Sequence, residues 1–173
     1  RGRPRRHAVT MPKRCRRMVK YHNFDVVFAE IPDEVTLAIN LTNCPNRCPG
    51  CHSPHLRADG GEPLDDGGLL ALLGKYARSV TCVCFMGGDA EPQEVARLAR
   101  VAKRAFPALR TGWYSGRERL PEGVAAEAFD YVKLGSWIEK RGPLTAPGTN
   151  QRLYRVGAGG TMTDITERFR RSS

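Results

Sequence analysis

Apolar and polar residues alternate in some parts of the chain and follow a helical spacing in others. Residues 35–41 carry apolar side chains at every second position, which predicts a strand with one better-buried face, and residues 25–28 form a shorter β-prone run. Residues 69–77 carry four leucines and a tyrosine along one helical stripe, and Asp65 or Asp66 is placed to cap the start of that helix. The first half of the chain therefore predicts strands followed by a helix.

The second half of the chain repeats this succession. A β-prone run over 80–86 precedes a helix that begins near Pro92, since the first turn of a helix tolerates proline, and continues to Ala105. The remaining predicted elements are strands over 109–114, 131–134 and 153–156 and a short helix over 122–129.

Polar segments follow three of the predicted strands, after Leu41, Met86 and Tyr114. Repeated strand–loop–helix units imply a parallel sheet, and ligands of such sheets bind at the carboxyl ends of the strands. We therefore predict an α/β fold in which these three segments converge at one edge of the sheet.

Composition permits a single domain over residues 20–173. The chain has 173 residues, of which 40% are hydrophobic, enough for one complete core but short for two. No apolar run approaches the roughly 18–20 residues that cross a bilayer, and no apolar block follows the N-terminal charges as in a secretory signal. We therefore expect a soluble, cytoplasmic protein with no membrane partner.

The net charge of +10 is concentrated at the N-terminus. Residues 1–20 carry nine of the 28 Lys and Arg residues and no acid, which leaves 19 basic residues to balance 18 acidic ones elsewhere. This pattern predicts a basic, disordered arm over residues 1–19 rather than a charged folded surface. A mitochondrial transit peptide and a non-specific nucleic-acid-binding arm are the alternatives, and nucleic acid is not the partner we expect.

Three cysteines, Cys44, Cys48 and Cys51, fall within eight residues. Thiolates suit zinc, iron–sulfur clusters and copper(I). A structural zinc site would need a fourth ligand, which His52 or His55 is placed to supply. An iron–sulfur cubane held by only three thiolates would instead keep one iron open for substrate chemistry.

The other cysteines do not suggest a second half of a metal site. Six cysteines are compatible with disulfides in principle, but cytosolic thiols are normally kept reduced. Cys82 and Cys84 lie one residue apart on a predicted strand and so share a face, which favours core packing over ligation.

The spacing Cys-x3-Cys-x2-Cys after a first strand resembles the signature of radical S-adenosylmethionine (SAM) enzymes. The resemblance implies that Cys44, Cys48 and Cys51 hold a [4Fe–4S] cluster and that the amino and carboxylate groups of SAM bind the fourth iron. It also implies that the backbone around Gly50, Cys51 and His52 contacts SAM. The chemistry is then carried by the cluster and SAM rather than by a catalytic side chain.

Gly87, Gly88 and Asp89 follow the next strand and resemble the Gly-Gly-Glu or Gly-Gly-Asp segment of the same enzymes. In that family the segment contacts the amino group of SAM. Glycines allow close approach of the backbone, and a carboxylate is a suitable acceptor for an ammonium group.

Further motifs narrow the resemblance to the activating proteins of anaerobic ribonucleoside-triphosphate reductases. They are Cys-Pro-Gly-Cys over 48–51, Trp-Tyr-Ser-Gly over 113–116, and Gly-Thr-Asn-Gln-Arg over 148–152. The resemblance spans about residues 20–156. It implies a partial (β/α) barrel of the radical SAM type, with about five to six parallel strands and outer helices. Asn150, Gln151 and Arg152 then either line the mouth of the site or form a solvated turn.

The implied reaction begins with one electron passing from the reduced cluster to SAM, supplied by a flavodoxin-like or ferredoxin-like donor. The resulting 5′-deoxyadenosyl radical removes a hydrogen atom from a glycine of the partner reductase. Two features depart from the family, namely His52-Ser53 in place of an aromatic residue and Asn, and Glu30 to Glu34 in place of a Gly-rich turn. Activation of another glycyl-radical enzyme and modification of a peptide are therefore alternatives. A zinc-stabilised nucleic-acid-binding module that uses residues 1–20 is an alternative of a different class.

Overall fold

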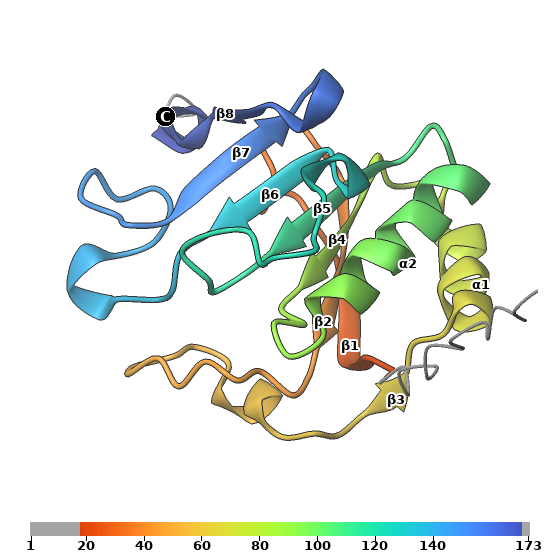
Figure 1. Ribbon diagram of the computed structural model, residues 1–173, viewed down its shortest axis with the longest axis horizontal. Coiled ribbons are helices and arrows are strands. Elements are labelled where there is room, and N and C mark those ends of the chain that lie inside the picture. Colours follow the sequence, from red (N-terminus) through yellow and green to blue (C-terminus); the bar gives the residue numbers. More distant parts are fainter. Residues whose placement is uncertain (1–17, 171–173) are drawn as a thin grey trace, which may run out of the picture.

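The computed structural model describes residues 18–170, and nearly all of the predicted arm over 1–19 lies outside them. Within this part of the chain, eight strands form one sheet in the order β3-β1-β2-β4-β5-β6-β7-β8 (Figure 1). The strands are β1 (Lys20–Val27), β2 (Thr36–Leu41), β3 (Glu62–Pro63), β4 (Cys82–Met86), β5 (Arg110–Tyr114), β6 (Tyr131–Leu134), β7 (Arg152–Val156) and β8 (Met162–Asp164). The helices are α1 (Asp66–Tyr76) and α2 (Pro92–Ala105), with short 3-10 turns η1 (Pro54–Arg57), η2 (Ala126–Ala128), η3 (Glu139–Arg141), η4 (Ala158–Gly160) and η5 (Thr166–Arg170).

The middle of the sheet is parallel and its flanks are antiparallel. Strands β2, β4, β5 and β6 run parallel to one another, whereas β1, β3, β7 and β8 join through antiparallel pairs. Four parallel strands thus replace the predicted five to six. Strand β7 returns antiparallel to β6 because only loop and the 3-10 turn η3 connect them, without the crossover helix that a parallel return requires. Closure of the sheet into a partial barrel stays a prediction.

Both helices cover the same face of the sheet (Figure 1). The side chain of Asp65 accepts a hydrogen bond from the Gly68 amide at 2.7 Å, which confirms one of the two predicted caps of α1, and α2 begins at Pro92 as predicted. The predicted helix over 122–129 is instead the 3-10 turn η2. No helix within residues 18–170 is both long and apolar enough to cross a membrane.

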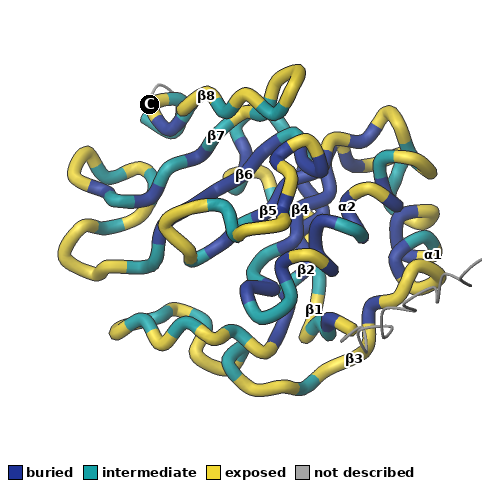
Figure 2. Tube along the Cα trace, in the orientation of Figure 1, coloured by how far each residue is buried: buried dark blue, intermediate teal, exposed yellow. Residues whose placement is uncertain are grey.

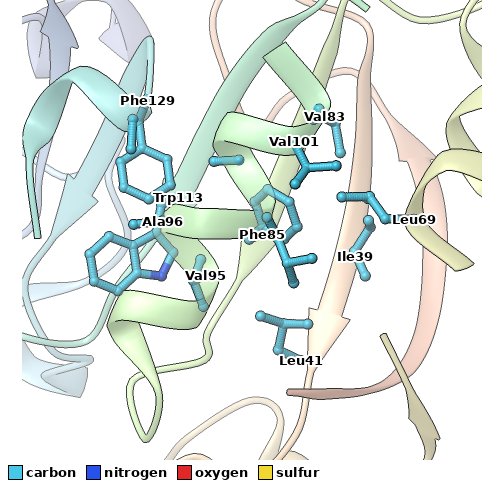
Figure 3. Close-up of a cluster of buried hydrophobic side chains, with 14 of the residues drawn as sticks. Ile39, Leu41, Leu69, Val83, Phe85, Val95, Ala96, Val101, Trp113 and Phe129 are labelled. Carbon is cyan, nitrogen blue, oxygen red and sulfur yellow. The ribbon is translucent and has the colours of Figure 1, made fainter. Parts of the chain in front are cut away.

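The main core lies between the sheet and the two helices. Phe85 of β4 and Trp113 of β5 are fully buried there, and Val95 of α2 packs among them (Figure 3). Phe129 stacks on Trp113 with ring centroids 5.4 Å apart. This packing fixes the carboxyl ends of β4 and β5, from which the candidate site extends.

A smaller cluster covers the opposite face of the sheet. Cys82 and Cys84 are both fully buried in it, against Ile31 from the β1–β2 connection and Leu153 of β7. The prediction that these two cysteines belong to the core is confirmed. Burial raises the pKa of both thiols well above 9.0.

The buried thiols predict a loss of stability in alkali. Above about pH 9 the thiols ionise in the unfolded chain but stay protonated in the fold, so the free energy of unfolding falls as the pH rises. Each thiol contributes up to about 1.4 kcal/mol per pH unit. Urea titrations between pH 7 and pH 10 should show a shallower decline for the Cys82→Ala/Cys84→Ala variant. An equal slope in the two proteins would contradict this account.

Candidate functional site

The segments that follow β2, β4 and β5 meet at one edge of the sheet (Figure 1). Asp89, after β4, accepts hydrogen bonds from Asn46 Nδ2 at 2.6 Å, Ser115 Oγ at 2.6 Å and the Gly116 amide at 2.8 Å. Its side chain is only 1% exposed. The predicted convergence of the polar segments is therefore confirmed, and a buried carboxylate joins them.

The cysteine loop leaves the sheet directly after β2 and is largely exposed along its length (Figure 2). Two backbone hydrogen bonds close its base, from Asn43 N to Ala58 O and from Cys44 N to Leu56 O, each 3.0 Å long. A further hydrogen bond from Cys51 N to Cys48 O, at 3.3 Å, makes the turn that carries the last two cysteines. All three cysteines are half-buried and free.

The thiols of this loop lie close enough to influence one another. Burial is the main cause of the raised pKa of Cys44, and the nearby Asp89, Cys48 and Cys51 raise it further. A metal group bound by the thiols would supply positive charge and offset these effects. Three free thiols on one short loop form a donor set whose chemistry suits an iron–sulfur cluster, as it does zinc.

Within residues 18–170, no three His, Cys, Asp or Glu side chains converge as a single metal ion requires. A zinc ion would gather its sulfur ligands at about 2.3 Å from one point, whereas in a cubane cluster each thiolate binds a different iron. The two histidines considered as zinc ligands pack elsewhere. His52 lies 4.3 Å from the Trp137 ring and His55 lies 5.0 Å from the His22 ring, measured between centroids.

The backbone conformation of the Gly-Gly-Asp turn largely explains why its first two residues are glycines. Gly87 and Gly88 have φ angles of +94° and +83°. A Cβ atom on Gly88 would lie 2.5 Å from Val95 Cγ2 and 2.7 Å from Leu41 Cδ1, so this glycine is required for packing. The Gly87 carbonyl already accepts a hydrogen bond from Trp113 Nε1 at 2.8 Å.

Asp89 has little free capacity as an acceptor. A carboxylate offers about four acceptor positions, and hydrogen bonds from Asn46, Ser115 and Gly116 take three of them. Arg117 Nε lies 4.0 Å from Oδ1, the oxygen that accepts only one hydrogen bond. The observed contacts make Asp89 the residue that ties the loops together, and its contact with the SAM amino group stays a prediction.

A cavity of about 290 Å³ lies beside the last cysteine of the loop. Its aromatic walls include His52, Tyr114 and Trp137, and Glu30 and Gln151 add polar groups. Burial raises the pKa of the Glu30 carboxyl, and the Trp137 indole N–H is buried without an acceptor among the described residues. The cavity therefore offers flat apolar surface, whereas the Trp137 N–H is covered and lies next to the Gly50 turn.

The cysteine turn borders Trp137 directly. A Cβ atom on Gly50, whose φ angle is +66°, would lie 3.6 Å from Trp137 Nε1 and 3.3 Å from Glu139 Oε2. The turn at Gly50 and the β6–β7 connection therefore face each other, which puts the predicted SAM-contacting segment over 50–52 next to the cavity.

A second cavity of about 290 Å³ lies on another side of the Gly-Gly-Asp turn. Val19, Asn43, Gly88 and Glu91 are among its lining residues, and none of the three cysteines of the loop lines it. The first cavity is the better candidate for a ligand of the cysteine loop, since His52 directly follows Cys51.

The three C-terminal residues singled out from the sequence brace the β6–β7 connection. Asn150 Nδ2 donates to Ser136 O at 3.0 Å, and Gln151, which also lines the cavity, donates to Gly142 O at 3.4 Å. The Arg152 guanidinium donates to Thr149 O at 2.7 Å and lies 3.5 Å from an Asp164 oxygen.

Three residues near the site were missed by sequence reasoning, namely Arg57, Lys133 and Trp137. Lys133 is 8% exposed, donates to Gly135 O at 2.6 Å, and forms no ion pair within the described part of the chain. Burial is the main cause that lowers its pKa to about 8. A lysine within the otherwise apolar strand Tyr-Val-Lys-Leu was a detectable signal, because such a charge is rarely buried without a role.

No protein-family model, curated protein or solved structure matches this chain. The geometry of the site therefore carries the functional argument.

Proposed function

We propose that this protein is a radical SAM activase, which cleaves SAM reductively at a [4Fe–4S] cluster and generates a glycyl radical on an anaerobic ribonucleoside-triphosphate reductase. Cys44, Cys48 and Cys51 are the proposed cluster ligands. The observation that carries the proposal is the hydrogen bond between Asn46 of the cysteine loop and Asp89 of the Gly-Gly-Asp turn, at 2.6 Å. It joins the two segments that resemble the family, at the carboxyl ends of the parallel strands β2 and β4.

When bound, the cluster and SAM together supply a 5′-deoxyadenosyl radical that abstracts a hydrogen atom from glycine. The chain's own contribution is to hold its ligands and to exclude water. The loop base at Asn43 and Cys44 fixes the entry of the cysteine loop, and Asp89 fixes its middle through Asn46. Such anchoring positions the reacting groups and limits the loss of the radical to side reactions.

The cavity beside Cys51 is the proposed binding site for the nucleoside part of SAM. Ring systems stack well on aromatic side chains, and His52 and Trp137 already lie 4.3 Å apart at one wall. The Trp137 ring would contribute to the wall through its face, because its N–H is covered next to the Gly50 turn. Reductive cleavage of SAM consumes one electron, and a flavodoxin-like or ferredoxin-like protein is the proposed donor.

The choice of partner is tested by a glycyl-radical assay. The reconstituted protein, SAM, a chemical reductant and an anaerobic ribonucleoside-triphosphate reductase are mixed without oxygen, and the glycyl radical is followed by electron paramagnetic resonance (EPR). A radical that appears only with all components supports the proposal. Cleavage of SAM without a radical on the reductase would favour another glycyl-radical enzyme or a peptide as the substrate.

The Trp137→Phe variant tests the cavity. It keeps an aromatic wall but replaces the indole by a smaller ring, so we expect about a tenfold higher Kd for S-adenosylhomocysteine, which corresponds to about 1.4 kcal/mol. Isothermal titration of the reconstituted protein measures this. The neighbouring Ile138→Ala is the control, because Ile138 is 39% exposed and does not line the cavity. Equal affinities of Trp137→Phe and the wild type would rule out stacking of the ligand on the Trp137 indole.

A further inference from the structure

Arg57 reaches from η1 back into the cysteine loop. Its Nη2 donates to the Cys48 carbonyl oxygen at 2.7 Å. The residues on either side of it are fixed to the start of the loop, since Leu56 O accepts from Cys44 N and Ala58 O accepts from Asn43 N. The guanidinium is therefore held against the loop by the same contacts that close its base.

The remaining donor capacity of Arg57 is unused. Its Nε–H is buried and has no acceptor among residues 18–170, and the guanidinium forms no ion pair there. A buried N–H without an acceptor is costly, and most such groups in native structures are paired. Residues 18–170 supply no acceptor for this N–H, so a group bound by the adjacent cysteine loop is a suitable partner for it.

A cluster held by three thiolates is a suitable acceptor. Cubane sulfurs and cysteine thiolates accept hydrogen bonds, and both net charge and such bonds set the reduction potential. Other charges face the same loop. Lys133 interacts electrostatically with Cys48, Asp89 interacts with Cys44, and a Glu139 oxygen lies near Gly50. Of these groups, Arg57 is the one that combines positive charge with a hydrogen bond to the loop itself.

We propose that Arg57 donates its Nε–H to a sulfur of the group bound by the cysteine loop and so makes one-electron reduction of that group easier. This inference rests on the proposed function, because it requires an iron–sulfur cluster. Reduction adds one negative charge, delivered by the external electron donor. A nearby cation with a directed N–H favours the more negative state. Arg57 is thus a positioning and tuning residue rather than a catalytic one.

The midpoint potential of the reconstituted protein tests this inference, by redox titration with EPR detection. Arg57→Gln removes the charge and the Nε–H, and we expect a potential more negative by about 59 mV, a tenfold change for a one-electron couple. Arg57→Lys keeps the charge and should shift the potential in the same direction by less. Arg47→Gln is the matched control, because Arg47 lies in the same loop but is exposed, and should leave the potential unchanged.

A second measurement avoids dependence on the stability of the variants. Wild-type protein labelled with 15N at arginine Nε should show a hyperfine coupling to the reduced cluster in pulsed EPR. If the wild type binds a cluster but shows no coupling, or if both Arg57 variants keep the wild-type potential, the inference is overturned and the proposed function stands. If the wild type binds no cluster at all, the proposed function fails and the inference fails with it.

Discussion

Alanine at Cys44, Cys48 or Cys51 is expected to abolish cluster binding and SAM cleavage. Each substitution removes one of the three proposed iron ligands, and the loop over 42–58 contains no further thiol to replace it. Changes in the outer shell of metal sites already cost about 10–100-fold in affinity or activity, so we expect losses beyond about 100-fold here. Iron content and 5′-deoxyadenosine after anaerobic reconstitution measure the two effects.

The two core cysteines provide controls of the same chemistry. Cys82→Ala and Cys84→Ala remove thiols that are fully buried on the face of the sheet opposite the helices. They should retain the iron content of the wild type. Retention of a cluster by the triple Cys44/Cys48/Cys51 variant, or its loss in the Cys84→Ala variant alone, would show that the ligands have been misassigned.

Asp89→Ala is the second substitution with a large expected effect. It leaves Asn46 Nδ2, Ser115 Oγ and the Gly116 amide without their acceptor at a buried position. One to three kcal/mol is typical for each stranded donor, and after relaxation we expect a total loss of about 3 kcal/mol in the free energy of unfolding. Urea unfolding of the cluster-free protein measures this loss.

The same variant should also loosen the cysteine loop, because the Asn46 contact is lost. We therefore expect slower cluster assembly and faster loss of iron to a chelator. Asp59→Ala is the matched control, since Asp59 is 61% exposed and its 3.0 Å ion pair with Lys20 lies at the surface. It should change stability by less than about 1 kcal/mol. Wild-type rates of cluster assembly and iron loss in Asp89→Ala would show that Asp89 does not anchor the cysteine loop.

Local patterns were sufficient to predict most of the secondary structure. Alternation over 35–41 and the helical stripe over 69–77 correspond to β2 and α1, and Asp65 caps α1 as its position suggested. These local patterns could not predict the direction of β7. Periodicity identifies a strand but not its partner, and the loop before Arg152 contains no helix to return the chain in parallel.

The candidate site likewise contains residues that the sequence predicted and residues that only the fold brings to it. The cysteine loop and Asp89 were recognisable because short, local spacings carry their chemistry. Arg57 and Trp137 contribute through contacts that the fold creates. Arg57 donates a hydrogen bond to the Cys48 carbonyl oxygen, nine residues earlier, and Trp137 of the β6–β7 connection lies next to Gly50. Neither contact has a local sequence signature, and the same holds for the lack of an acceptor for either N–H group among residues 18–170.

The most direct test asks whether SAM binds the iron that the three proposed cysteine ligands leave without a protein ligand. EPR and hyperfine spectroscopy of the reduced, reconstituted protein are recorded with SAM labelled with 15N at its amino group. If SAM binds this iron, adding SAM changes the spectrum and the labelled nitrogen couples to one iron. An unchanged spectrum in excess SAM, with every iron ligated by protein side chains, would contradict SAM binding at this iron.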